Sequence, residues 1–494
     1  MSDFDPHFSE INTGRKRPSD QVEINDSTAQ GLPSTVKKIL LLAPNVAAGS
    51  AADGQLIQNV TNQDDVGVYC GVIAKRLAAK IFSANPLADL DILAIDEAGT
   101  GVAAFNTITF ATAAAADGGI TLWFGDYPVE VAVLTDDTAA EICAAAVAAV
   151  TAAAADCPVS ATQGTDANTH VLTYTYGVKG TIGNYLRVSA DVDAALTTTA
   201  SVVQPASGAN DPVLSAYVAT YQSRDYDLIV VPWRFVTTDL TALKNAAIYQ
   251  AHAARGNGAM HLIGIADTYA NAVTYQTSMQ RRDMIVLWRK AANYWPMPPH
   301  ERAALEAGYV SAEADPSVPI INDARPLDLA PLETGATAPT AAEIENAMNN
   351  GLSVDVSRED GTTEVVQLIT TATQLSGGAA SDAWASPHIW FVLKYLRKAI
   401  LARLQTVYST RASRKMIDGK TGDVKGQVLS VLYELADPSL QYLSKNELDR
   451  LAGDIVVRVN TTNTKFIDIG VPAPVITEYR GANVMLNLTI PQVG

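Results

Sequence analysis

The sequence predicts an α/β core domain with an inserted α+β outer domain and extended N- and C-terminal arms. Three observations support this fold class. Continuous apolar runs of strand length alternate with helical stretches in two separate parts of the chain. The segment between these parts alternates apolar and polar residues, as half-buried strands do. Residues 1–30 are polar and acidic, unlike a core.

The size and charge of the chain exclude several classes of protein. It has 494 residues with 35 Lys and Arg against 52 Asp and Glu, a formal net charge of −17. This length suggests about three domains. No apolar run reaches the roughly 18 residues of a membrane-spanning helix, and the acidic N-terminus lacks the features of a signal peptide. The negative charge also disfavours broad binding to nucleic acid. We therefore expect no nucleic-acid partner and no membrane insertion.

The N-terminal arm is assigned to residues 1–30. Within it, Val22 and Ile24 alternate with polar residues and predict a short strand. Because the segment offers few local partners, such a strand would need another surface with which to pair.

The inner core domain is assigned to residues 31–96 and 208–300. Its strands are expected at 37–43, 90–96, 226–232, 260–266 and 283–288. A helical stretch over 64–82 separates the first two strands, and further helices separate the last three. Such apolar strands alternating with helices predict a parallel sheet that is covered on both faces.

The inserted outer α+β domain is assigned to residues 97–207. Its strands are expected at 107–111, 120–124, 128–133, 171–176 and 186–192. Residues 139–155 contain 11 Ala in 17 positions, which favours a helix. An insertion of this kind is well tolerated at an exposed loop.

The C-terminal part of the inner domain is assigned to residues 301–464, and the C-terminal arm to 465–494. A long irregular connection is expected over 300–350, followed by a strand at 363–371. Ser386 and Pro387 supply an N-cap and a first-turn proline for a long helix. In the arm, residues 483–490 alternate strictly, so one apolar face is expected. This face consists of Val484, Leu486, Leu488 and Ile490.

The sequence carries only weak matches to motifs of catalysis, metal binding and cofactor binding. Residues 99–104 match the G-x-G-x-x-A pattern, but a strand-like segment follows where a nucleotide site needs a helix. The three cysteines form no C-x-x-C pair, and no two of the six histidines are spaced i, i+4. We therefore predict no catalytic residue, no metal ligand and no cofactor.

One segment reverses the sign of the overall charge. Residues 389–416 contain seven basic side chains and no acidic one. Of these, Lys394, Arg397 and Lys398 flank the apolar stripe of the predicted helix. Two interpretations stay open: a solvated face with ion pairs inside the chain, or a docking face for an acidic partner.

A series of motifs in a fixed order resembles a known family. The motifs are FSEIN at 8–12, GLP at 31–33 before KKILLLA, NTITF at 106–110, GITL at 119–122, PVSA at 158–161, GTIGN at 180–184, RPL at 325–327 and EVVQLITT at 364–371. Together with the Ala-rich helix and the long helix after Pro387, they resemble the contractile tail sheath proteins of myovirus-type phages, in particular the Mu-like sheaths. The similarity runs over nearly the whole chain.

The resemblance implies a structural role and no enzymatic activity. Sheath subunits stack as hexameric rings in a helical sheath around the tail tube, which contracts and drives the tube through the host envelope for genome ejection. The implied location is the tail sheath of the virion, assembled in the host cytoplasm. The implied partners are further copies of the chain, the tail tube protein, and baseplate and tail terminator proteins.

The resemblance also implies roles for particular residues. In such sheaths the terminal arms add strands to neighbouring subunits, which suggests intersubunit contacts for Val22, Ile24, Val484, Leu486, Leu488 and Ile490. Lys394, Arg397 and Lys398 become candidates for a tube-facing basic face. Two alternatives are the sheath of a tailocin or other contractile injection system, and a nucleotide-binding α/β enzyme suggested by residues 99–104.

Overall fold

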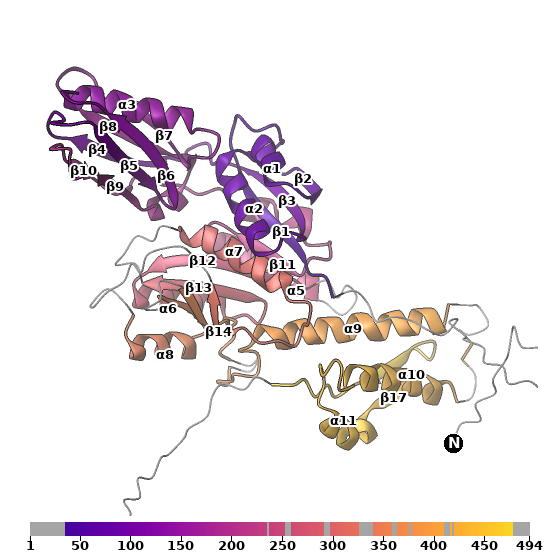
Figure 1. Cartoon of the computed structure of the whole chain (residues 1–494). Helices are drawn as coiled ribbons and strands as arrows, with labels where there is room; N and C mark the ends of the chain where they lie inside the picture. The colour runs from indigo at the N-terminus through magenta and orange to yellow at the C-terminus, as the bar shows by residue number, and fades with distance from the viewer. Residues whose placement is uncertain are drawn as a thin grey trace, which may run out of the picture.

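The computed structural model describes residues 35–234, 237–251, 258–290, 297–325, 339–357, 363–374, 378–409, 415–416 and 419–477. At its centre is a sheet with the strand order β14-β16-β15-β13-β12-β11-β1-β3-β2 (Figure 1). These strands are β1 (Lys38–Asn45), β2 (Leu56–Val60), β3 (Asp89–Asp96), β11 (Leu228–Val231), β12 (Met260–Asp267), β13 (Met284–Lys290), β14 (Ile321–Arg325), β15 (Ser353–Ser357) and β16 (Thr363–Gln367). The strands from β15 to β3 are parallel to one another. At the edges, β2 pairs antiparallel with β3, β16 pairs antiparallel with β15, and β14 pairs antiparallel with β16.

Helices cover both faces of this sheet, which explains why its strands are apolar throughout. In β1, Ile39 and Leu41 pack with α1 (Gln63–Cys70), α2 (Val72–Ala84) and α7 (Pro299–Ala312). The alternate residues Leu40 and Leu42 belong to the core on the other face, with α5 (Thr237–Ala251) and α6 (Tyr269–Met279). The predicted parallel sheet with two covered faces is therefore confirmed.

The helical stretch expected at 64–82 is two helices. α1 ends and α2 begins at Gly71, whose φ is 102°. A Cβ on this residue would lie 2.6 Å from Cγ2 of Val46, so a glycine is required both by the backbone conformation and by the close packing. The apolar spacing continues across the break, which is why the pattern alone predicts one helix.

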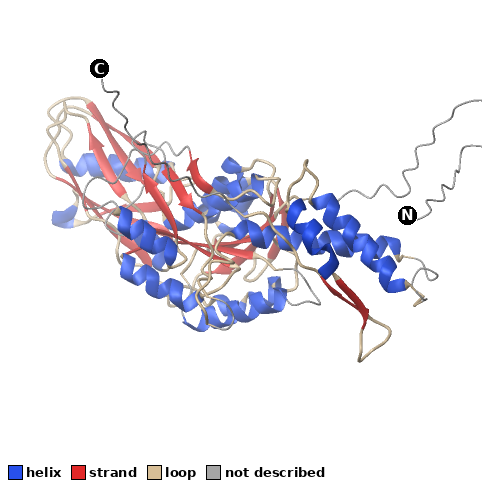
Figure 2. Ribbon diagram, turned by 90° about the horizontal axis from the view of Figure 1, so that it is seen from below, coloured by secondary structure: helices blue, strands red, loops and turns tan. Residues whose placement is uncertain are grey.

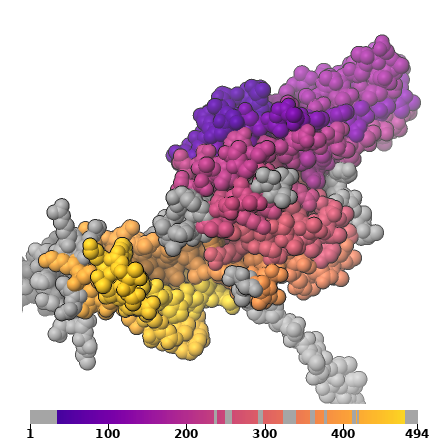
Figure 3. Space-filling model, turned by 180° about the vertical axis from the view of Figure 1, so that it is seen from behind, coloured from indigo at the N-terminus to yellow at the C-terminus, as the bar shows by residue number. Residues whose placement is uncertain are grey.

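Residues 103–202, called the outer block, form two sheets and one long helix of their own. The sheets have the orders β10-β4-β8-β7 and β6-β5-β9. Their strands are β4 (Ala103–Phe110), β5 (Gly118–Phe124), β6 (Tyr127–Val133), β7 (Val159–Gln163), β8 (Val171–Lys179), β9 (Val188–Val192) and β10 (Ala200–Val202). Helix α3 (Ala139–Ala152) starts with a capping box between Thr138 and Glu141. The block projects from one side of the body (Figure 1, Figure 3).

The long irregular connection expected over 300–350 is wrong. This stretch contains α7, β14 and α8 (Ala341–Asn349). Helix α7 gives no amphipathic signal because almost every side chain on it is buried, including Glu301, Arg302 and Glu306. These charges are tolerated because they are paired; Arg302, for example, contacts Asp355 at 2.9 Å.

The C-terminal part lies along the underside of the body (Figure 1, Figure 2). It contains α9 (Pro387–Val407), α10 (Lys420–Leu435), α11 (Lys445–Leu451) and the hairpin of β17 (Val456–Val459) and β18 (Ile467–Gly470). Ser386 stands at the predicted N-cap of α9, but its hydroxyl lies 2.7 Å from Nδ1 of His388 and makes no capping bond to the helix backbone. A third core joins α9 to α10 through Val392, Leu396 and Val428, among others.

The two strands predicted in the arms, around Val22 and over 483–490, lie outside the described residues.

Candidate functional site

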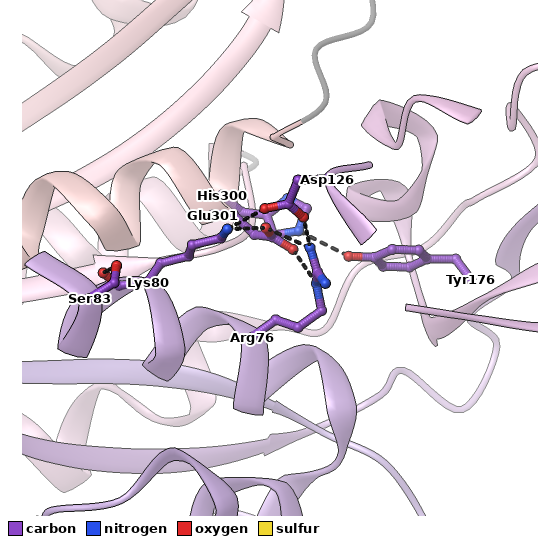
Figure 4. A network of polar contacts seen from close by, with 7 residues as sticks. All are labelled: Arg76, Lys80, Ser83, Asp126, Tyr176, His300 and Glu301. Atoms are coloured by element: carbon purple, nitrogen blue, oxygen red, sulfur yellow. Dashed lines mark hydrogen bonds and ion pairs between the residues drawn. The ribbon is translucent and has the colours of Figure 1, made fainter. Parts of the chain in front are cut away.

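A cluster of charged side chains joins the outer block to the body (Figure 4). This junction cluster consists of Arg76 and Lys80 on α2, Glu301 at the start of α7, and Asp126 in the β5–β6 turn. Arg76 donates through Nε to Oε1 of Glu301 at 2.8 Å and also pairs with Asp126. Lys80 pairs with Asp126 as well and lies 4.0 Å from Oε2 of Glu301. Two cations and two carboxylates therefore balance one another.

Burial and pairing shift the titration of this cluster. Burial acts to raise the pKa of Asp126, but Arg76 and Lys80 outweigh burial, so the pKa is lowered overall. Burial likewise opposes the charge of Arg76, yet Glu301 and Asp126 raise its pKa above the usual range. Both groups are therefore charged at neutral pH, and the pair contributes a fixed contact between the block and the body.

A second polar contact lies beside the cluster. The hydroxyl of Tyr176, on β8 of the outer block, lies 3.0 Å from Nε2 of His300 on α7. Both groups are buried. Burial, with a smaller effect of nearby Arg76, lowers the pKa of His300 to about 3, so this imidazole is neutral at pH 7. The junction thus combines an ionic and a neutral contact.

The three predicted cations of α9 lie in different environments. Lys394 is buried, pairs with Asp227 at 2.7 Å and Asp225 at 3.0 Å, and donates to the carbonyl of Tyr226. Lys398 is about one third exposed and also pairs with Asp225 at 3.0 Å. Burial acts to raise the pKa of Asp225, and the two lysines outweigh it and lower the pKa.

These contacts bear on the interpretations of the basic segment. Lys394 and Lys398 form ion pairs inside the chain, as the first interpretation expects. Their charges are balanced by Asp225 and Asp227, whereas Arg397 lines a surface cavity beside Trp390. The tube-facing role of Lys394, Arg397 and Lys398 stays a prediction.

The β17–β18 hairpin is a candidate interface that the sequence analysis missed. Within the described part of the chain it is a sheet of two strands alone. Val456 and Phe466 are 52% and 63% exposed. Two-stranded sheets are marginal by themselves, and an exposed edge with apolar side chains favours pairing with another strand. The alternation of apolar and charged residues in Val457-Arg458-Val459 is the sequence pattern that could have indicated this strand.

The Gly-rich segment at 99–104 and the three cysteines lie in the described part of the chain. A turn is closed by the hydrogen bond from Gly101 N–H to the carbonyl of Ala98, and Val102 then bridges Ala209 before β4 begins at Ala103, so this segment does not open the helix that a nucleotide site needs. Cys70, Cys143 and Cys157 are free and buried. Among the described residues no group of His, Cys, Asp or Glu has the arrangement of a metal site. No helix in the same described part has the length and apolar content to cross a bilayer.

Comparisons with known proteins connect the fold to a class of proteins. No family model matches the chain. The chain is 24% identical over 410 residues to the tail sheath protein of the Mu-like prophage FluMu from Haemophilus influenzae, an alignment that covers 80% of this chain and 81% of that protein.

Two solved sheath structures are more distant. A sheath tail protein from Desulfitobacterium hafniense is 14% identical, with a TM-score of 0.46 over 89% of this chain and 93% of that chain. The sheath of an extracellular contractile injection system, the PVC sheath complex in the contracted state, is 10% identical, with a TM-score of 0.46 over 96% of this chain and 98% of that chain.

All three relatives are named as sheath proteins, which are structural, and none is named as an enzyme. The resemblance that the motifs predict, to Mu-like contractile tail sheath proteins, is therefore confirmed by a sequence similarity that spans four fifths of the chain.

Proposed function

We propose that the chain is the sheath subunit of a contractile tail. One observation carries this proposal, the similarity over 410 residues to a Mu-like tail sheath protein. The subunits polymerise as hexameric rings in a helical sheath around the tail tube. Contraction of the sheath then drives the tube through the host envelope for genome ejection. The energy is stored in subunit packing, so no cofactor is needed.

The proposed location is the tail of the virion, after assembly in the host cytoplasm. The partners are further copies of the chain, the tail tube protein, and the baseplate and tail terminator proteins. The alternative is the sheath of a tailocin or other contractile injection system. One of the distant structures, the PVC sheath complex, is named as a sheath of this second kind.

The division into an inner and an outer domain is part of this proposal. The outer block has its own sheets and its own helix, and it joins the body through the junction cluster. We assign residues 97–207 to the outer domain, and residues 31–96, 208–300 and 301–464 to the inner domain. The arms are residues 1–30 and 465–494.

The β17–β18 hairpin, whose second strand lies at the start of the C-terminal arm, is the proposed acceptor for the terminal strands of neighbouring subunits. A strand with one apolar face leaves its backbone unpaired and its apolar row exposed when it is alone. Adding it to the hairpin of another copy satisfies the backbone of both and covers exposed side chains such as Val456 and Phe466. The donated residues are Val484, Leu486, Leu488 and Ile490, with Val22 and Ile24 as the N-terminal equivalent.

The basic side of α9 is the proposed tube-facing surface. A sheath must release its tube on contraction, so weak and salt-screened ion pairs suit this contact. Of Lys394, Arg397 and Lys398, Arg397 is the residue whose reversal leaves the pairs with Asp225 and Asp227 intact. Arg397→Glu should therefore reduce assembly on the tube without unfolding the subunit. Unchanged assembly would remove this part of the proposal.

Negative-stain microscopy of the purified full-length chain tests the proposal as a whole. A sheath subunit is expected to form striated tubes as its concentration rises. Discrete particles at every concentration would contradict the proposal. Microscopy of particles from the producing cells distinguishes a phage tail from a tailocin, because a phage tail is attached to a capsid and a tailocin is not.

A further inference from the structure

A surface cavity beside the first turns of α9 has the chemistry of a small binding site. Its volume is about 220 Å³, and its walls include Arg282, Trp384, Trp390 and Arg397. The guanidinium of Arg282 lies 4.5 Å from the ring centre of Trp384 and 5.2 Å from that of Trp390. The two indole rings meet edge to face, with their centres 6.5 Å apart. Aromatic and cationic surfaces therefore converge on one cavity.

Two donors at this site have no acceptor among the described residues. Arg282 is exposed and makes no ion pair or hydrogen bond with any residue in the described part of the chain. The Nε1–H of Trp390 is buried, and it too has no acceptor there. Of the two, the exposed guanidinium of Arg282 is the donor that a ligand in the cavity can reach, and it favours a ligand that carries an acceptor group.

The charged groups near the cavity do not supply an acceptor for Arg282. Lys394 also lines the cavity, but its ammonium group pairs with Asp225 and Asp227. These two carboxylates pair with Lys394 and Lys398, and no contact joins either of them to Arg282. The ligand best suited to the cavity is a peptide with an aromatic side chain next to carboxylates.

The first ten residues of the chain have this composition. They contain Asp3, Phe4, Asp5, Phe8 and Glu10, and no Lys or Arg. The described part of the chain begins at Thr35, which lines a smaller cavity with Lys394 and Lys398 on the same helix. The chain therefore enters the body beside α9. The 24 residues 11–34 can span up to about 80 Å when extended, more than enough to reach the site.

We propose that residues 1–10 of the unassembled chain dock into this cavity of the same chain. Phe4 packs against Trp384 and Trp390, and the flanking carboxylates of Asp3 and Asp5 pair with Arg282. Docking within one chain is favoured over docking between chains, because the tether supplies a high effective concentration. This contact concerns the single subunit and does not depend on the sheath function.

The test is photo-crosslinking of the full-length chain at a concentration where it is monomeric. Phe4 is replaced by p-benzoylphenylalanine, and the crosslinked residues are mapped by mass spectrometry. We expect a crosslink within one chain to residues 384–397. Arg282→Glu should lower its yield about fivefold, as should Asp3→Asn combined with Asp5→Asn, in line with the loss of a favourable charge pair. Arg450→Glu, an equal charge reversal on exposed α11, should leave the yield unchanged.

Three results would overturn the proposal. The crosslink maps away from residues 384–397, the yield is the same in Arg282→Glu as in the unmodified chain, or the product has the mass of two chains. The substitutions of Asp3 and Asp5 are made outside the described body, so a loss of yield with them cannot be caused by its unfolding.

Discussion

The ammonium nitrogen of Lys394 lies 2.7 Å from Oδ1 of Asp227, although 167 positions separate the two residues in the sequence. The lysine lies on α9, and the aspartate directly precedes β11 in the centre of the main sheet. Both side chains are largely buried. This contact fixes the C-terminal part of the chain to the α/β body and takes a predicted surface charge out of the solvent.

Removing this lysine should destabilise the chain strongly. Lys394→Met leaves Asp227 buried without its nearest cation, at a cost of about 3 kcal/mol in the free energy of unfolding. Lys398→Met is the matched control, because the more exposed Lys398 should contribute less than about 1 kcal/mol. Urea denaturation of both variants measures the difference. Equal midpoints would show that the buried pair of Lys394 and Asp227 contributes no more to the free energy of unfolding than the more exposed Lys398.

Breaking the junction cluster should loosen the outer block. Asp126→Asn removes the carboxylate that Arg76 and Lys80 share, while Glu301 stays in place. We expect faster proteolysis in the connections at 97–102 and 203–209, and about 2 kcal/mol of lost stability. Asp117→Asn is the control, since this exposed acid of the same block contacts Thr135 and has no cationic partner within the described residues. Identical proteolysis of the two variants would contradict the role of the cluster.

Two buried histidines should make the fold acid-sensitive. Burial lowers the pKa of His261 to about 4 and that of His300 to about 3, against about 6.5 in an unfolded chain. Below pH 6.5 the unfolded state binds protons that the folded state excludes, so stability falls with pH. The expected loss between pH 7 and 5 is on the order of 2 kcal/mol for each imidazole.

Two variants can show whether His300 causes this pH dependence of stability. His300→Gln should flatten the slope of stability against pH between 7 and 5. Tyr176→Phe removes the hydrogen bond to His300 but leaves the imidazole buried, so it should lower stability at every pH and keep the slope. Urea midpoints at pH 7, 6 and 5 measure both effects. A slope that His300→Gln leaves unchanged would exclude this imidazole as the cause.

The C-terminal strand offers a neighbouring pair of positions for testing assembly. Leu488 is on the apolar face of the predicted strand and Thr489 on the opposite face. If the apolar face packs on another subunit, Leu488→Asp should raise the concentration needed for tube formation by about tenfold or more. Thr489→Asp should change it little. Light scattering against concentration gives both values, and equal thresholds would refute the proposed face.

The main sheet and several helices could be predicted from the sequence because their signals are local. A parallel strand buried on both faces must be apolar along its length, so segments such as 37–43 identify themselves. The Ala-rich composition of residues 139–155 predicted α3 in the same local way. The order of short motifs also predicted the resemblance to tail sheath proteins, which the comparison bears out.

Other features depended on contacts between distant parts of the chain. Helix α7 is buried on all sides, so it lacks the amphipathic pattern by which a surface helix is recognised. Helix α9 likewise packs on two sides, with Phe391 toward the body and Val392 toward α10, so a single apolar stripe does not describe it.

The sequence by itself determined the class of fold, the order of its main elements and the kind of protein it resembles. The tertiary structure decided which charges face the solvent. Arg76 meets Glu301 and Lys394 meets Asp227 across separations of 225 and 167 residues. A charge on a helix is equally compatible with solvent and with a buried partner, and its partner is chosen by how the layers pack. No pattern in the sequence near either residue records that choice.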